Sequence, residues 1–200
     1  LWHASRVARA ISDGLSVTNV VFMGMGEPLD HIPTVQDSVS VMTEYLRIAP
    51  RRITVSTVGD KPDAIRALAG TGVQLALSLH APNDKLRQQI VPTGKHTSIP
   101  SILQAVEDFL EAQKAGKKRS SVMVEYIVIR GVNDQIEHAV ELRRLLEGKP
   151  VWCNLIPYNP TSAGDRYGFE MPDTAQVSRF AEELRKGVAA DGKPLKVRAR

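Results

Sequence analysis

The chain has 200 residues, of which 42% are hydrophobic and 24% are charged, and this composition predicts a globular domain with its own core. No uninterrupted apolar run reaches the roughly 18 residues that a membrane-spanning helix needs, and the start of the sequence lacks a signal-peptide pattern. A single cysteine excludes an internal disulfide, and the net charge of +4 is a mild basic excess. We therefore expect a soluble domain that suits a reducing compartment.

Strand and helix patterns alternate along the chain. The first half predicts helices over residues 1–14, 34–46 and 62–69, and strands over residues 19–23, 53–57 and 74–80. The second half predicts helices over residues 101–115, 134–147 and 173–186, and strands over residues 122–129, 151–157 and 195–198. Units of this size imply parallel strands joined by right-handed crossovers, in either a partial barrel or a doubly wound sheet.

The loop after the first strand carries the clearest signal of ligand binding. Residues 20–22 are apolar and uncharged, which predicts a strand buried on both faces. Gly24 and Gly26 follow, and both can adopt positive φ and bring backbone N–H groups close to a ligand. Pro28 then restricts the orientation of Glu27. This pattern indicates a ligand-binding loop, and the alternative that the residues leave open is a glycine-rich turn with a solvated glutamate.

Polar residues also follow the other predicted strands. They are Ser56-Thr57, Ser78 to His80, Asn133-Asp134 and Asn159. Ligands bind at the carboxyl ends of parallel strands, and only a barrel gathers about five such ends around one axis, so we favour the barrel. Each residue also has a structural alternative, as a loop cap, a satisfied buried histidine or a turn residue. Phosphate-loop, dinucleotide and zinc motifs are absent from the sequence.

Basic residues gather in two segments that could contact phosphates. One holds Lys114, Lys117, Lys118 and Arg119, and the other holds Arg185, Lys186, Lys193, Lys196, Arg198 and Arg200. The alternative is a solvated helix end and loop, which we prefer for the first segment. Few aromatic residues interleave with these charges, so a base-stacking surface is not predicted. Cys153 lies within a predicted strand, and we interpret it as a small core residue.

Short blocks spread over nearly the whole chain resemble the radical S-adenosylmethionine (SAM) methyltransferases of the RlmN and Cfr type, and RlmN is the nearer of the two. The resemblance rests on the order and spacing of seven blocks. They are MGMGEPL at 23–29, RRITVST at 51–57, LSLHAPND at 77–84, IVP at 90–92, VEY at 124–126, GVND at 131–134 and NLIPYNP at 154–160.

The resemblance implies a set of cofactor-binding residues. They are Gly26, Glu27, Ser56, Ser78, Leu79, His80 and Asn159. By this resemblance, the glycine and glutamate hold the amino group of SAM, and the first serine contacts the same cofactor. The segment from Ser78 to His80 contacts the ribose, and the asparagine faces the adenine edge. Carboxylate, hydroxyl and amide groups are suited to these tasks.

The resemblance also implies a fold and an activity. The fold is an α/β, partial radical-SAM (β/α)6-type barrel over residues 1–200 that lacks its first strand and the family's N-terminal accessory domain. The activity is methylation of adenine C2 in 23S rRNA, and in bacterial members also in tRNA, with SAM and a 4Fe–4S cluster as cofactors. The implied partners are ribosomal RNA, tRNA and an electron-donor protein, and we expect a monomer in the cytoplasm or in an organelle with bacterial-type ribosomes.

The sequence departs from the family at the residues that carry the chemistry. The family binds its cluster through a CxxxCxxC motif, but this sequence has one cysteine and no metal-ligand motif. The family's methyl-carrying cysteine and its proton-accepting glutamate have no counterpart either, so no catalytic residue can be assigned. We therefore expect the chain alone to be inactive. Two alternatives are a noncatalytic relative that binds nucleoside or RNA, and a different radical SAM enzyme that acts on a small metabolite.

Overall fold

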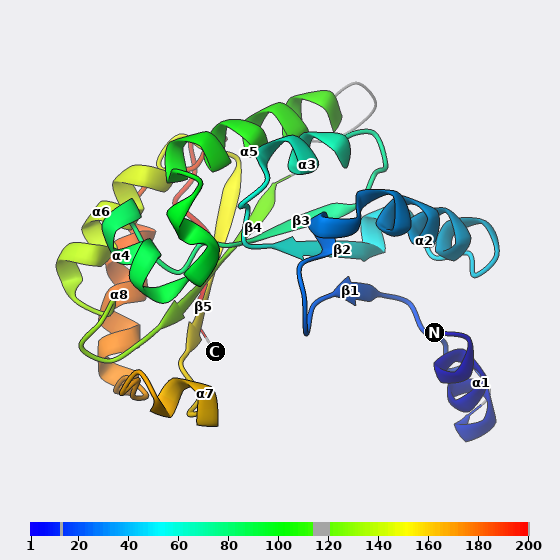
Figure 1. The fold of residues 1–200 in the computed structure, drawn as a ribbon, viewed down its shortest axis with the longest axis horizontal. Helices are drawn as coiled ribbons and strands as arrows, with labels where there is room; N and C mark the ends of the chain where they lie inside the picture. Colours follow the sequence, from blue (N-terminus) through cyan, green and yellow to red (C-terminus); the bar gives the residue numbers. More distant parts are fainter. Residues whose placement is uncertain (13, 114–120, 200) are drawn as a thin grey trace.

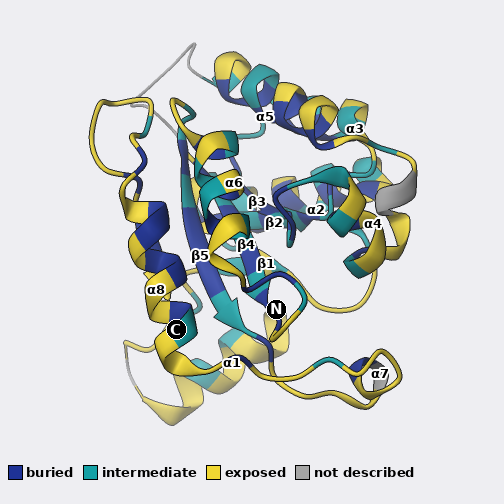
Figure 2. Cartoon of the chain, turned by 90° about the vertical axis from the view of Figure 1, so that its left-hand side faces the viewer, coloured by how far each residue is buried: buried dark blue, intermediate teal, exposed yellow. Residues whose placement is uncertain are grey.

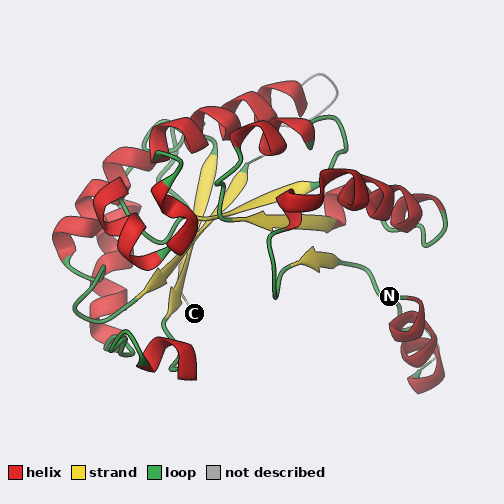
Figure 3. Cartoon of the chain, viewed as in Figure 1, coloured by secondary structure: helices red, strands yellow, loops and turns green. Residues whose placement is uncertain are grey.

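The computed structural model of the chain describes residues 1–12, 14–113 and 121–199. Within these residues, one sheet of six parallel strands forms the centre, and the order of the strands in space follows their order in the sequence (Figure 3). The strands are β1 (Val20–Phe22), β2 (Ile53–Thr57), β3 (Gln74–Ser78), β4 (Val122–Val128), β5 (Val151–Pro157) and β6 (Val197–Ala199). Because every neighbouring pair is parallel, all the carboxyl ends lie at the same edge.

Most of the helices connect the strands and cover the outer face of the curved sheet, whereas the first helix lies apart from it (Figure 1). The helices are α1 (Trp2–Ile11), α2 (Ile32–Glu44), α3 (Pro62–Ala67), α4 (Asp84–Ile90), α5 (Ile99–Gln113), α6 (Ile136–Leu146), α7 (Ser162–Asp165) and α8 (Thr174–Arg185). Short 3-10 turns are η1 (Pro28–His31), η2 (Pro50–Arg52) and η3 (Pro92–Lys95). In the described residues β1 and β6 do not pair with each other, so the sheet remains open. The predicted α/β, partial-barrel class is confirmed.

The core lies between the outer face of the sheet and the helices. Burial alternates along β2 and β4, so that one side chain faces the helices and the next faces the inner side of the sheet. In β2 the buried positions are Ile53, Val55 and Thr57, while Thr54 and Ser56 are only partly covered. Figure 2 shows the same division, with β5 largely buried and the outer surfaces of the helices exposed. The inner face is therefore available for a ligand.

The prediction that residues 20–22 form a strand is confirmed, but the prediction that both faces are buried is wrong. Val20 and Phe22 are half-buried, and Val21 is 54% exposed. The physical reason is the position of β1 at the edge of an open sheet, where it pairs only with β2. Val21 lies in register with Thr54 on the inner face, and no second layer of the described residues covers this face.

Helix α1 is present as predicted, although none of its residues is buried. Val7 is 56% and Ile11 is 71% exposed, and Figures 1 and 2 show the helix apart from the sheet. None of the helices in the described ranges is long and apolar enough to cross a lipid bilayer.

Helix α4 was not predicted, and it brings a charged residue into the core. Asn83 caps it, because its side-chain oxygen accepts a hydrogen bond of 3.0 Å from the N–H of Leu86. The helix has only seven residues, and it buries the side chain of Arg87 completely. An apolar stripe was therefore not available as a signal, and the Asn83-Asp84 cap was the feature that could have revealed the helix.

Candidate ligand-binding site

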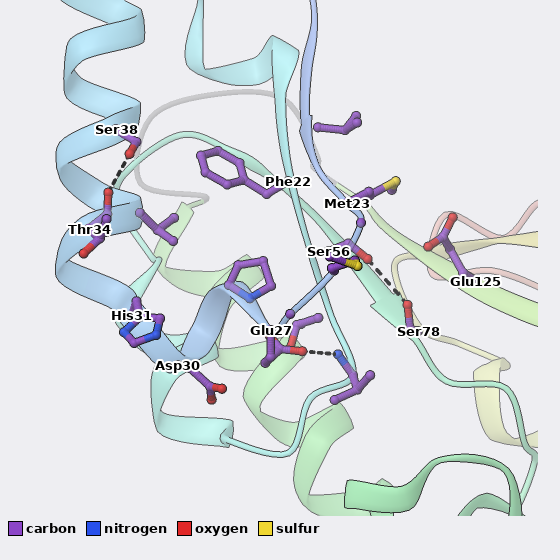
Figure 4. Close-up of a pocket in the computed structure, with 18 of the residues that line it drawn as sticks. Phe22, Met23, Glu27, Asp30, His31, Thr34, Ser38, Ser56, Ser78 and Glu125 are labelled. Carbon is purple, nitrogen blue, oxygen red and sulfur yellow. Dashed lines mark hydrogen bonds between the residues drawn. The ribbon is translucent and has the colours of Figure 1, made fainter. Parts of the chain in front are cut away.

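A cavity of about 870 Å³ opens at the carboxyl edge of the sheet, beside β1, β2 and α2. Four of the predicted site residues line it, namely Gly26, Glu27, Ser56 and Ser78. The other three, Leu79, His80 and Asn159, are not among its lining residues. Sequence reasoning missed Glu125, which also lines the cavity (Figure 4). The missed signal was that Glu125 is the only charged residue in the seven-residue strand β4.

Backbone conformation shapes the loop that carries Glu27. Gly24 has a φ of +142° and Gly26 has a φ of +94°, so the predicted positive φ values are confirmed at both positions. Glu27 itself is extended, with φ −114° and ψ 111°, as expected for a residue before proline. Pro28 opens η1 directly afterwards. The sequence therefore fixes the direction in which the carboxylate leaves the chain.

The Glu27 carboxylate is held by two backbone groups from different elements. One oxygen accepts a hydrogen bond of 3.1 Å from the N–H of Leu29, and this bond caps η1. The other accepts one of 3.0 Å from the N–H of Val58, just after β2. Glu27 thus ties the loop after β1 to the loop after β2. The predicted alternative of a freely solvated glutamate is wrong.

Two serine hydroxyl groups meet on the inner face of the sheet. The side chains of Ser56 in β2 and Ser78 in β3 point toward each other, with 3.5 Å between their oxygens (Figure 4). Each hydroxyl can donate one hydrogen bond and accept two, so this single long contact leaves most of their capacity unused. The pair can therefore bind further polar groups in the cavity.

The segment after Ser78 turns away from the strand and into the core. Leu79 is completely buried, and its N–H donates a hydrogen bond of 3.0 Å to the carbonyl of Glu125. His80 has a φ of +59°, which is unusual for a residue with a side chain, and it explains why β3 ends before the predicted residue 80. The Nδ1 atom of His80 accepts a hydrogen bond of 3.1 Å from the N–H of Ile127.

Asn133 holds this conformation of His80 in place. Its Nδ2 donates hydrogen bonds to the carbonyls of His80 at 2.9 Å and Ile127 at 2.7 Å, and its Oδ1 accepts one of 2.6 Å from the N–H of Ile129. The hydroxyl of Tyr126 donates to the carbonyl of Asn133 at 2.8 Å. The structure therefore gives this polar residue of the GVND block a structural task, which is to join the ends of β3 and β4.

Stability should depend on pH through His80. Burial, and then the positive charge of Arg87, lowers the pKa of His80 from 6.5 to about 4. Between pH 6.5 and 4 the unfolded chain binds a proton that the folded chain does not. The free energy of unfolding should therefore decrease by up to about 3 kcal/mol as the pH is lowered from 6.5 to 4. Below about pH 4 this contribution is fully lost.

Urea unfolding at a series of pH values measures this effect when the chain is compared with His80→Asn. Asparagine tolerates the positive φ of this position and does not titrate. The difference between the two proteins should change over pH 4–6.5 and stay constant above it. Parallel stability curves would contradict a neutral His80 whose pKa is lowered in the folded chain.

The remaining predicted site residue, Asn159, is exposed and follows β5. It lies at the same edge of the sheet as the cavity, because β5 is parallel to the other strands. The structure therefore brings four of the seven residues into one cavity, and the other three are not among the residues that line it.

In the described residues, the basic side chains of the second segment contact groups of the protein itself. Lys186 pairs with Glu183 at 2.5 Å, Lys193 pairs with Asp191 at 3.6 Å, and Arg185 donates to a carbonyl of β6 at 3.2 Å. Lys196 and Arg198 lie over the ring of Trp152, at 5.5 and 5.4 Å from its centroid. The residues Lys114, Lys117, Lys118, Arg119 and Arg200 lie outside the described residues.

The side chains of the cavity suit an organic ligand better than a metal cluster. Hydroxyl groups, a fixed carboxylate and glycines with positive φ can bind the hydroxyl and amino groups of a nucleoside. No group of three or more His, Cys, Asp or Glu residues in the described ranges could hold a metal ion. Cys153 is completely buried, as predicted, and burial raises its pKa to about 12. An iron–sulfur cluster therefore does not fit the residues of this chain.

Comparison with known proteins gives the family. The model of the radical SAM superfamily matches residues 4–143. The dual-specificity RNA methyltransferase RlmN of Marinobacter nauticus is 45% identical over 84% of this chain and 44% of its own length. The probable RlmN of Synechocystis sp. is 42% identical over 84% of this chain and 46% of its own length. The chain thus spans less than half the length of these curated relatives.

Solved structures agree with the sequence comparison. The crystal structure of a radical SAM methyltransferase from Sphaerobacter thermophilus superposes with a TM-score of 0.84 and 38% identity, over 98% of this chain and 55% of that protein. A domain of pyruvate-formate lyase-activating enzyme from Bacteroides vulgatus has the same fold, with a TM-score of 0.68 and 17% identity. Since the superfamily model covers more than half of the chain and includes the loop of Glu27, the chain belongs to the radical SAM superfamily.

Proposed function

We propose that this chain is part of an RlmN-like methyltransferase that modifies adenine C2 in 23S rRNA and in tRNA, and that its cavity binds SAM. The observation that carries the proposal is the convergence of Gly26, Glu27, Ser56 and Ser78 on one cavity at the carboxyl edge of the sheet. These residues come from three separate segments of the sequence. The RlmN relatives are dual-specificity RNA methyltransferases by name, which supports RNA as the substrate.

Each proposed ligand residue has a group available for its task. The oxygens of Glu27 each accept one backbone N–H, and each can accept a further hydrogen bond from the amino group of SAM. Ser56 and Ser78 offer hydroxyl groups to the same ligand. His80 uses Nδ1 within the protein, which leaves its Nε2–H to donate to a ribose hydroxyl. Asn159 would meet the adenine edge, and Leu79 would set the course of the chain between Ser78 and His80.

The radical SAM superfamily uses SAM together with a 4Fe–4S cluster, and these groups supply the radical chemistry. This chain has none of the cluster's cysteine ligands, so we derive no reaction step from its residues. Its own contribution is to bind SAM and to orient it against the sheet. We therefore propose that the 200-residue chain binds SAM but transfers no methyl group by itself.

We propose that residues 1–200 form one partial barrel domain, and that the first barrel strand and an N-terminal accessory domain belong to a segment outside this sequence. The unpaired edge of β1 supports this, because an additional strand would pair with the backbone groups of that edge. We further propose an electron-donor protein as a partner, a monomeric state and a location in the cytoplasm or in an organelle with bacterial-type ribosomes.

A second candidate function is noncatalytic binding of a nucleoside or an RNA, and the absence of cluster ligands from the sequence favours it for the chain taken alone. A radical SAM enzyme for a small metabolite is the third possibility from the sequence. RNA binding by the chain would argue against the third possibility. Restoring methyl transfer by adding a cluster-binding segment would separate the first from the second.

Calorimetric titration of the chain with SAM tests the proposed function. We expect one site, and we expect the double variant Ser56→Ala, Ser78→Ala to bind about tenfold more weakly, since it loses two neutral hydrogen-bonding groups. Thr34→Ala provides a control, because this hydroxyl also borders the cavity but lies on α2. Failure of the unmodified chain to bind SAM would overturn the proposal.

A further inference from the structure

A row of polar side chains crosses the inner face of the sheet at one level. Ser78 of β3 is in register with Glu125 of β4, and Glu125 is in register with Asn154 of β5. Neighbouring strands lie about 4.8 Å apart, so side chains in register on one face are in reach of the same ligand. Figure 4 shows Glu125 beside the Ser56 and Ser78 pair. The row therefore continues the serine pair toward the middle of the sheet.

The acidic side chains that line the cavity differ in how they are satisfied. Three carboxylates line it, from Glu27, Asp30 and Glu125, whereas no lysine or arginine does. Glu27 accepts two backbone N–H groups, and Asp30 pairs with Lys61 at 2.5 Å. In the described part of the chain, no hydrogen bond or ion pair reaches the Glu125 carboxylate. Among the three lining carboxylates, Glu125 is thus the one without a hydrogen-bond or ion-pair partner in the described residues.

The neighbours of Glu125 do not balance its charge either. Arg198 is in register with Asn154, but its guanidinium lies over the ring of Trp152. Asn154 is 6% exposed, and its Oδ1 is buried with no hydrogen-bond partner in the described residues. Two acceptors, the Glu125 carboxylate and this amide oxygen, therefore stand side by side without donors. Such a pair favours a ligand that carries positive charge or N–H and O–H groups.

We propose that Glu125 is a specificity residue that faces the positively charged sulfonium end of SAM. This inference rests on the proposed function, because it assigns a role within the same cavity. A carboxylate there attracts the cationic sulfonium, while S-adenosylhomocysteine has a neutral thioether at the same place. Glu125 then makes the cavity bind SAM more tightly than S-adenosylhomocysteine.

Titrations of SAM and of S-adenosylhomocysteine into the chain and into Glu125→Gln test this role. Glutamine has the same shape, and the carboxylate has no internal bond to lose, so the fold should be kept. We expect SAM to bind about tenfold more weakly to Glu125→Gln, while S-adenosylhomocysteine changes by less than about twofold. Glu182 is an exposed residue of α8 outside the cavity, and Glu182→Gln removes the same charge. This variant should change the affinity for neither SAM nor S-adenosylhomocysteine.

The outcomes separate this inference from the proposed function. Equal weakening of both ligands would overturn it, because Glu125 would then contact a group that the two share, such as the ribose. Unchanged binding of both ligands by Glu125→Gln would also overturn it, while SAM binding by the unmodified chain would stand. If the unmodified chain binds neither ligand, the proposed function fails, and the role of Glu125 fails with it.

Discussion

Replacing Asn133 by aspartate should lower the free energy of unfolding by about 3–5 kcal/mol. Asn133 is completely buried, and its Nδ2 donates to the carbonyls of His80 and Ile127. Aspartate would place an oxygen against these two carbonyl oxygens, so two donors are lost and like partial charges meet in the core. Ionisation of the new carboxyl group would add the cost of a buried, unpaired charge.

The measurement is urea unfolding followed by circular dichroism, with Asn19→Asp as the matched control. Asn19 is exposed, and the same change there should alter stability by no more than about 0.5 kcal/mol. Because Asn133 holds the carbonyl of His80, its replacement should also disturb the end of β3 at the cavity. A loss below about 1 kcal/mol for Asn133→Asp would show that the join between β3 and β4 does not depend on this side chain.

Replacing Glu27 by glutamine should weaken SAM binding by about 2 kcal/mol, or roughly 30-fold. Glutamine can still accept one of the two backbone N–H groups, but its NH2 group would face the other donor. The tie between Leu29 and Val58 then breaks, and the negative charge proposed to face the SAM amino group disappears. The amino group is common to SAM and S-adenosylhomocysteine, so both ligands should lose affinity, unlike in Glu125→Gln.

Asp30→Asn is the matched control for Glu27→Gln, because it makes the same chemical change three residues later. Asp30 and Lys61 form a partly exposed ion pair, whose side chains are 45% and 49% exposed, and such pairs contribute about 0–1 kcal/mol to stability. We expect SAM affinity to change by less than about threefold in Asp30→Asn. Similar losses in both variants would mean that the cavity senses total charge and not the fixed position of Glu27.

The strand pattern could be predicted from the sequence because local chemistry determines it. The bounds of β2 (Ile53–Thr57) and β5 (Val151–Pro157) agree with the predicted ranges, since both segments are rich in β-branched, aromatic and other apolar residues and β5 ends at a proline. The positive φ values of Gly24 and Gly26 follow from the same local reasoning. The loop that carries Glu27 lines the cavity with these two glycines.

The burial of β1 and the partners of the polar residues could not be predicted in this way. Burial on both faces needs a neighbouring strand and a second layer, and neither is encoded within residues 20–22. The task of Asn133 depends on three backbone groups that meet only when β3 and β4 pair. Glu125 joins Ser78 through the register of two strands that are far apart in the sequence. The candidate site is thus visible in the sequence as separate residues, and the sheet assembles them.

The most direct test of the central claim is a crystal structure of the chain with SAM. We predict that SAM occupies the cavity at the carboxyl edge of the sheet, with its amino group at Gly26 and Glu27 and its ribose beside Ser78 and His80. Electron density for SAM at another place on the chain, with this cavity free of ligand, would contradict the assignment of the site.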